Sequence, residues 1–172
     1  CLSQKKKLQE AGCADYKESV KLLFSEAYSI PLNQSYDYQT HKGLDKNATL
    51  FSSMVNRRAV GEPTAQIVRS RSFWKNDFYI EETVLDPRPE SEVIIEVVRN
   101  HLFDDMKVLD LGCGSGCIGL SLKRENPEIS LYMSDFSNKA LSVARKNAFD
   151  FKMECKFIHS NLFSNIDEKF DL

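Results

Sequence analysis

The sequence predicts an α/β protein in which a parallel sheet, with helices on both faces, follows a small helical domain and a β-hairpin. Helical periodicity with a single apolar stripe dominates up to about residue 60. The period changes to two between Ala65 and Leu85. From residue 107 onwards, short apolar runs alternate with helical segments, which is typical of parallel βαβ units.

Two amphipathic helices are expected in the first part of the chain. Apolar residues recur at i, i+3, i+4 and i+7 within residues 15–30. Asp15 and Glu18 predict a capping box at the start of this helix, and Pro31 is expected to end it. A second helix is expected over residues 49–60. Both stripes predict core packing rather than a cofactor site.

A hairpin and a further helix are expected next. Residues 66–74 and 78–85 have the pattern of two strands around the turn "KND", and their aromatic residues are Phe73, Trp74, Phe78 and Tyr79. In "DPRPESE", Pro89 suits the first position of a helix, and the acids that follow suit its first turn. The residues expected to pack inward from this helix are Val93, Ile94, Val97, Val98 and Leu102.

The rest of the chain alternates strand and helix. The expected strands are "KVLDL", "ISLYMSD" and "CKFIHSN", and the expected helices cover residues 117–124 and 137–149. Ligands of such sheets bind beyond the carboxyl ends of the strands, where the loop "DLGCGSG" falls. Glycines in this loop permit positive φ and a close approach of a ligand to the backbone.

A nucleotide-like ligand is therefore expected at this loop. Asp135 ends the second strand, 23 positions after Gly112, where a carboxylate can accept both ribose hydroxyls of an adenosine. Gly114, Gly116 and Gly119 also fit the dinucleotide fingerprint G-x-G-x-x-G, so NAD is a rival. Asp110 favours S-adenosylmethionine, because a carboxylate suits a cationic amino acid end and repels a pyrophosphate.

Composition excludes several other classes. The 172 residues carry a net charge of −2, which gives no general attraction to nucleic acid or to anionic membranes. Five scattered cysteines argue for a reducing compartment and a cytoplasmic protein; Cys113 and Cys117 have no further ligand cluster, so we expect no metal site. We assign no role to His41, His101 or His159, and we expect no membrane span and a monomer.

Three blocks of sequence resemble the release-factor glutamine methyltransferases (PrmC/HemK). The first is "RRAVGEPTAQIVRSRSFWKNDFYIEETVLDPRPESEVIIE", where the family has "PRPETE", so that Ser91 replaces a Thr. The second is "VLDLGCGSGCIGLSL", and the third is "SDFSNKALSVARKNA" followed by "FIHSNLF". Most methyltransferases that use S-adenosylmethionine share the glycine loop, whereas the first block is far more specific.

The resemblance implies three parts. Residues 1–63 correspond to a helical domain that docks a release factor, residues 64–88 to a hairpin linker, and residues 89–172 to an incomplete Rossmann-like class I methyltransferase domain. The implied cofactor is S-adenosylmethionine, and the residues implied to bind it are Gly112, Cys113, Gly114, Ser115, Gly116, Asp135, Asn161 and Leu162. The family more often has Asp where this chain has Asn161.

The implied reaction is methylation of the side-chain amide nitrogen (N5) of a glutamine in a peptide chain release factor. The family holds that amide with an N-P-P-Y motif, which would fall beyond Leu172, so we expect a fragment that carries no catalytic residue and is inactive and unstable by itself. Three alternatives stay open: a methyltransferase acting on RNA or DNA bases, an NAD(P)-dependent oxidoreductase, and a module that only binds a partner.

Overall fold

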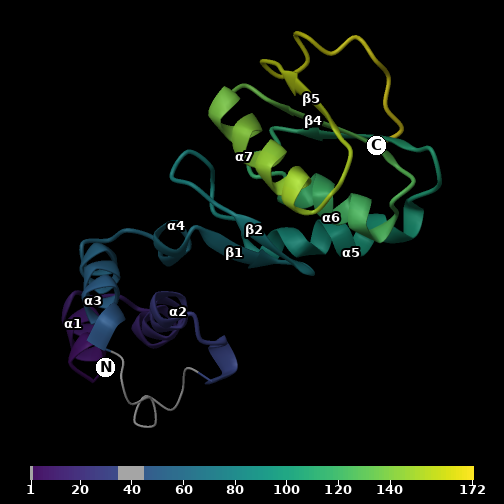
Figure 1. The fold of residues 1–172 in the computed structure, drawn as a ribbon. Helices are drawn as coiled ribbons and strands as arrows, with labels where there is room; N and C mark the ends of the chain where they lie inside the picture. Colours follow the sequence, from purple (N-terminus) through teal and green to yellow (C-terminus); the bar gives the residue numbers. More distant parts are fainter. Residues whose placement is uncertain (1, 35–44) are drawn as a thin grey trace. The chain divides into compact units, whose positions relative to one another are not determined.

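The computed structural model describes residues 2–34 and 45–172, and the chain divides into two units, residues 1–69 and 70–172 (Figure 1). Cys1 and His41 lie outside the described residues. Each unit has a hydrophobic core of its own.

The first unit is helical, as expected. Its helices are α1 (Leu2–Glu10), α2 (Tyr16–Tyr28), α3 (Asp45–Ala59) and α4 (Thr64–Val68), with a short 3-10 helix η1 (Leu32–Gln34) after α2. Their apolar stripes meet in one core, formed by Leu8, Val20, Leu23, Phe24, Ala27, Phe51, Met54, Val55 and Ile67. The two predicted helices are confirmed, although α3 begins earlier than expected.

The predicted capping box at the start of α2 is wrong. The side chain of Asp15 bonds to no amide of the first turn. Its carboxylate accepts from Arg58 Nη2 at 2.6 Å and from Ser19 Oγ at 3.0 Å. A guanidinium is a stronger partner for a carboxylate than a backbone amide is, so the ion pair takes the side chain away from the helix end. The helix ends at Tyr28, where Ser29 is left-handed, before the expected stop at Pro31.

The hairpin is shorter than the sequence predicts. Residues 66–68, expected as strand, lie in α4, because the amides of Gln66 and Ile67 both donate to the carbonyl of Pro63 and close a helical turn. The antiparallel strands are β1 (Ser70–Phe73) and β2 (Asn76–Tyr79). Trp74 occupies the turn with φ of +54°.

The hairpin leads into a helical segment that packs differently from the expectation. It comprises η2 (Pro89–Ser91), α5 (Glu92–Val98) and η3 (Arg99–His101). Ile95 is the fully buried residue of α5, whereas Val93, Ile94 and Val97, which were expected to face inward, are exposed. The run "VIIEVV" is apolar almost all round, so its periodicity does not select one face.

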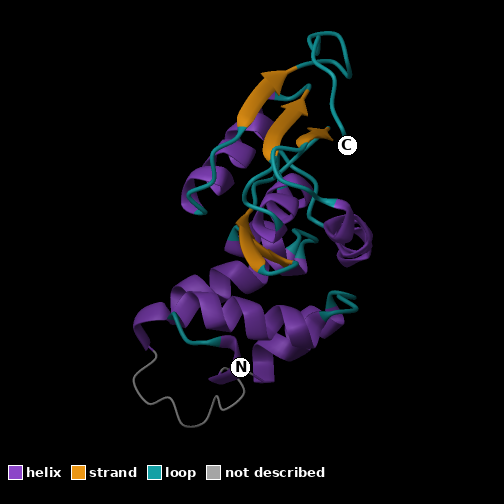
Figure 2. Cartoon of the chain, turned by 90° about the vertical axis from the view of Figure 1, so that its right-hand side faces the viewer, coloured by secondary structure: helices purple, strands orange, loops and turns teal. Residues whose placement is uncertain are grey.

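The second unit contains the predicted parallel sheet, seen as orange arrows in Figure 2. The strands β3 (Lys107–Leu111), β4 (Ser130–Asp135) and β5 (Lys156–His159) lie side by side in that order. The connecting helices are α6 (Cys117–Glu125) and α7 (Asn138–Asp150). Parallel strands end at one edge of the sheet, so Leu111, Asp135 and His159 share that edge.

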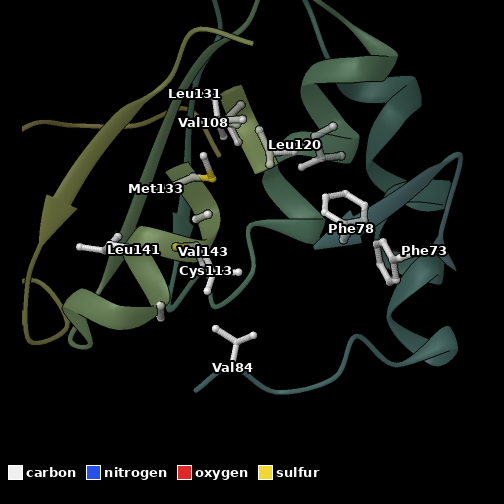
Figure 3. Close-up of a cluster of buried hydrophobic side chains, with 14 of the residues drawn as sticks. Phe73, Phe78, Val84, Val108, Cys113, Leu120, Leu131, Met133, Leu141 and Val143 are labelled. Carbon is white, nitrogen blue, oxygen red and sulfur yellow. The ribbon is translucent and has the colours of Figure 1, made fainter. Parts of the chain in front are cut away.

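The helices pack on one face of this sheet. Met133 of β4 lies close to both Leu120 of α6 and Ala144 of α7 around Gly116. Figure 3 shows Leu120, Met133 and Leu141 in one buried cluster. We expected helices on both faces; in the described residues the other face instead carries Tyr132, whose ring meets Phe170 edge-on at 5.0 Å.

Candidate functional site

The glycine loop, residues 112–116, joins β3 to α6 at the carboxyl edge of the sheet. Three glycines give it its path, because Gly112, Gly114 and Gly116 all have positive φ, of 76°, 54° and 78°. The amides of Gly112 and Cys113 donate to the carbonyl of Ser134, at 2.8 and 2.9 Å. The loop is thereby fixed to the end of the neighbouring strand, next to Asp135.

The two halves of the loop differ in what surrounds them. A Cβ atom built on Gly112 or Gly114 would meet nothing within 4 Å. A Cβ on Gly116 would lie 3.1 Å from Met133 Sδ and 3.2 Å from Leu120 Cδ1. The first half, Gly112 to Gly114, therefore exposes bare backbone to open space, and we call it the open half. The second half, which ends at Gly116, allows α6 to pack against the sheet, and we call it the packed half.

Gly119 extends the packed half into the first turn of α6. A Cβ there would lie 2.9 Å from Asp110 Oδ2 and 3.1 Å from Leu131 Cδ1. Glycine at this position lets the helix backbone touch the side chain of Asp110. Because this contact is internal, Gly119 serves packing rather than a ligand.

Asp135 lies beside the open half of the loop. Its Oδ2 accepts from the amide of Gly114 at 3.0 Å, and its Oδ1 accepts from the amide of Ser137 at 2.8 Å. A carboxylate has about four lone-pair positions, so each oxygen can accept one more hydrogen bond. Asp135 thus joins the sheet edge, the loop and the start of α7, and each of its carboxylate oxygens keeps a position for one more donor.

Asp110 is held by α6. Its Oδ2 accepts from the amide of Gly119 at 2.9 Å, which satisfies one of the free amides at the start of that helix. Burial raises the pKa of Asp110 to about 6; the bond from Gly119 opposes this rise, and the charge of Asp135 adds to it. One oxygen of the carboxylate that we expected to face the ligand is therefore bonded to the first turn of α6.

The side chains of Cys113 and Ser115 are buried and do not face the open half. Cys113 belongs to the core of the second unit and is labelled in Figure 3. Burial, together with the nearby carboxylates, raises the pKa of its thiol far above the ordinary value, so the group stays neutral. These loop residues can offer a ligand only their backbone.

Asn161 and Leu162 follow β5 at the same edge of the sheet. Leu162 is 66% exposed and left-handed, with φ of 50°. Ser160 Oγ braces this bend by donating to the carbonyl of Leu162 at 2.7 Å and accepting from the amide of Asn165 at 3.0 Å. A non-glycine residue in this conformation is strained, and Leu162 adopts it with its apolar side chain exposed.

Two further residues at this edge had no predicted role. The rings of Phe136 and His159 stack with centroids 6.2 Å apart, and His159 Nε2 lies 2.7 Å from the carbonyl oxygen of Phe136. Both side chains are exposed. The sequence places them after β4 and at the end of β5, but a single aromatic or histidine at a strand end gives no signal that the two will stack.

Other kinds of site are not found in the part of the chain that the structure describes. Its His, Cys, Asp and Glu side chains form no group of three or more that could hold a metal ion. Among the same residues, no helix is long and apolar enough to cross a membrane.

The comparisons with known proteins agree with this geometry. Residues 84–172 match the methyltransferase small domain family. The chain belongs to this family. The methyltransferase small domain thus begins in the second unit and includes the glycine loop, Asp135 and the bend at Leu162.

Curated relatives confirm the resemblance seen in the sequence. A release factor glutamine methyltransferase of Agrobacterium fabrum is 32% identical over 179 residues, which cover 99% of this chain and 62% of that protein. One of Leptospira interrogans is 39% identical, covering 74% of this chain and 47% of that protein. The chain therefore spans roughly half to three fifths of the length of these relatives.

A solved structure shares the fold. It is the tRNA (uracil-54, C5)-methyltransferase of Pyrococcus abyssi in complex with S-adenosyl-L-homocysteine, matched with a TM-score of 0.50 at 16% identity. The match covers 59% of this chain and 26% of that one. At this identity the likeness supports the α/β methyltransferase fold and says nothing of the substrate.

Proposed function

We propose that the protein transfers a methyl group from S-adenosylmethionine to the side-chain amide nitrogen of a glutamine in a peptide chain release factor. The observation that carries the proposal is the open half of the glycine loop with the carboxylate of Asp135 bonded to Gly114. The names of the relatives and the block from residue 57 to residue 96 support the substrate.

The residues present fit this cofactor. The backbone at Gly112 and Gly114 lies against open space in which a ligand can approach closely. Asp135 keeps two acceptor positions for the ribose hydroxyls, and Asn161 and Leu162 offer an amide and an exposed apolar side chain for an adenine. Cys113, Ser115 and Gly116 support the loop from the protein side.

The chemistry needs little from these residues beyond positioning. When bound, the cofactor supplies an electrophilic methyl group on a positively charged sulfur. Asp135 and the loop fix where that ligand lies, and alignment of the reacting atoms supplies much of the rate of such a transfer. The residues that grip the substrate amide are expected in the N-P-P-Y motif of the family.

The same proposal assigns the helical unit to docking of the release factor and places the protein in the cytoplasm. Support for the compartment comes from the cysteines, since Cys13, Cys113, Cys117 and Cys155 are all free thiols. An oxidoreductase using NAD is not favoured, because the relatives are named as methyltransferases.

Transfer of a labelled methyl group tests the substrate. The complete protein is incubated with labelled S-adenosylmethionine and a release factor, and with the same factor carrying a Gln→Ala change at the candidate glutamine. We expect label in the first factor and none in the second. Equal labelling of both, or label in RNA and none in the factor, would contradict the proposed substrate.

A further inference from the structure

Asn147 is a buried polar side chain that the cofactor site, as described above, does not include. It lies on α7 and is 1% exposed. Its Oδ1 accepts from the amide of Tyr79 at 2.7 Å, and its Nδ2 donates to the carbonyl of Tyr79 at 3.0 Å. The same Nδ2 donates to the carbonyl of Ser115 at 2.9 Å. One side chain thus joins α7, the end of β2 and the glycine loop.

These contacts fix the orientation of the amide group. The side chain of asparagine has two N–H donors and one acceptor oxygen, and both donors and the oxygen are used here. Turning the amide over would set its NH2 group against the amide of Tyr79 and its oxygen against two carbonyls. Leucine, whose side chain branches at the same carbon atom, would leave the backbone groups of Tyr79 and Ser115 without this hydrogen-bond partner.

Ser115 is the loop residue to which Asn147 is bonded. It lies between Gly114 and Gly116, which both have positive φ and more backbone freedom than other residues. The carbonyl of Ser115 is held by Asn147, and the amide of Gly116 donates to the carbonyl of Cys113 at 2.7 Å. The peptide unit between Ser115 and Gly116 is therefore held on both of its sides.

The bonds to Tyr79 resemble those of a neighbouring strand. A strand partner would also accept from the amide and donate to the carbonyl of one residue, as Asn147 does here. Beside it, Lys146 Nζ lies 4.8 Å from the centroid of the Tyr79 ring. The end of β2 is thereby fixed to the helix that also fixes the loop.

We propose that Asn147 is a positioning residue for cofactor binding, which holds the Ser115–Gly116 peptide so that the open half of the loop is preformed. The inference rests on the proposed use of S-adenosylmethionine. Asn147 acts through Ser115 and does not touch the ligand. Loss of its side chain is expected to free the loop and the end of β2 together, because both depend on one amide group.

The first test uses Asn147→Leu and Asn147→Ala in the complete protein, with Ile129→Ala as the control. Ile129 is buried in the same core but directly precedes β4, at the edge of the sheet opposite the loop, so its truncation lowers stability at a distance from the loop. We expect both Asn147 variants to weaken binding of S-adenosylhomocysteine about tenfold by calorimetry. Hydrogen exchange of the amides of residues 113–117 and 78–80 should rise in the same variants, and neither effect should appear in the control.

Two results of this test would overturn the inference. One is an Asn147 variant that binds S-adenosylhomocysteine as tightly as the wild type. The other is a control of equal stability loss that weakens binding as much, since Asn147 would then act only through stability. Failure of the wild type itself to bind S-adenosylhomocysteine would contradict the proposed function instead, so the two failures are distinguishable.

A second measurement uses the wild-type protein and therefore does not depend on whether a variant folds. In the wild type, the Nδ2 protons of Asn147 can be followed by nuclear magnetic resonance. We expect both to exchange slowly with water, because both are hydrogen-bonded, and we expect their resonances to shift when S-adenosylhomocysteine is added, because one of them donates to the loop carbonyl of Ser115. Fast exchange, or resonances that do not respond to the ligand, would contradict the assigned role.

Discussion

The two halves of the glycine loop use the same residue type for different physical reasons. At Gly112 and Gly114 a side chain would enter open space, so glycine there keeps the backbone accessible. At Gly116 and Gly119 a side chain would meet the core, so glycine there lets α6 approach the sheet. One glycine-rich motif thus combines exposed backbone, which we propose binds the ligand, with a packing contact. Substitutions in the open half should therefore change affinity, and those in the packed half should change stability.

The largest effect on the open half is expected from Asp135→Ala. This change removes the acceptor of the Gly114 amide and the carboxylate proposed for the ribose. We expect cofactor binding to weaken by roughly 2–3 kcal/mol, since hydrogen bonds to a charged group contribute about 1.5–3 kcal/mol each. Calorimetry with S-adenosylhomocysteine measures the change, and Asp167→Ala, at an exposed position, is the control. Unchanged affinity in the Asp135 variant would remove this residue from the site.

The free energy of unfolding is expected to depend on pH because of Asp110, whose side chain contacts Gly119 next to the packed half. Burial raises the pKa of this carboxyl to about 6 in the folded protein, above its value in the unfolded chain of about 3.9. The folded state then binds more protons than the unfolded state between these values, so the contribution of Asp110 to stability falls as pH rises from about 4 to about 6. The total loss should be on the order of 3 kcal/mol, since one pKa unit corresponds to about 1.36 kcal/mol.

Comparison of the wild type with Asp110→Asn isolates this contribution. Asparagine can still accept from the Gly119 amide but does not titrate. The free energy of unfolding, measured by denaturant titration across this pH range, should fall in the wild type relative to the variant. A difference between the two proteins that is constant with pH would contradict the raised pKa.

Gly119→Ala tests packing directly. The new Cβ would lie 2.9 Å from Asp110 Oδ2, which cannot move away without losing its bond to the same residue. We expect a loss of about 1–2 kcal/mol of stability, because the cost of overpacking exceeds the gain in helix propensity. Ser121→Ala on the same helix is the control, since its buried hydroxyl has no hydrogen-bond partner within the described residues. A melting temperature that does not fall in Gly119→Ala would contradict the close contact.

Gly114→Ala is expected to give the smallest change in stability, and it separates an effect on ligand binding from an effect on stability. Alanine in the left-handed conformation costs roughly 1 kcal/mol, and no neighbour would clash with it. Gly12→Ala in the helical unit is a matched control, because Gly12 has φ of 77° and is equally open. Both variants should lose similar stability, but only Gly114→Ala should also bind S-adenosylhomocysteine less tightly. Equal affinity in the two variants would mean that the open half carries no ligand.

The sequence predicts the parallel sheet, the glycine turn after β3 and the place of Asp135 at the end of β4, because glycines and strand ends are local signals. Exposed Val93 and buried Ile95 could not be told apart, since nearly every residue around them is apolar. Asn147 lies on the same buried face of α7 as Ala140 and Ala144. A polar residue on an apolar stripe is the sequence signal that points to its proposed positioning role. Its partners, Tyr79 and Ser115, come from distant parts of the chain and depend on tertiary structure.

The central claim is that an adenosine ligand with a sulfonium lies on the open half of the loop with its ribose on Asp135. A crystal structure of the complete protein with S-adenosylhomocysteine tests this most directly. The account predicts the ribose hydroxyls within hydrogen-bond distance of the Asp135 carboxylate and the ligand in contact with the backbone of Gly112 and Gly114. Ligand density elsewhere on the protein, or a ribose away from Asp135, would contradict it.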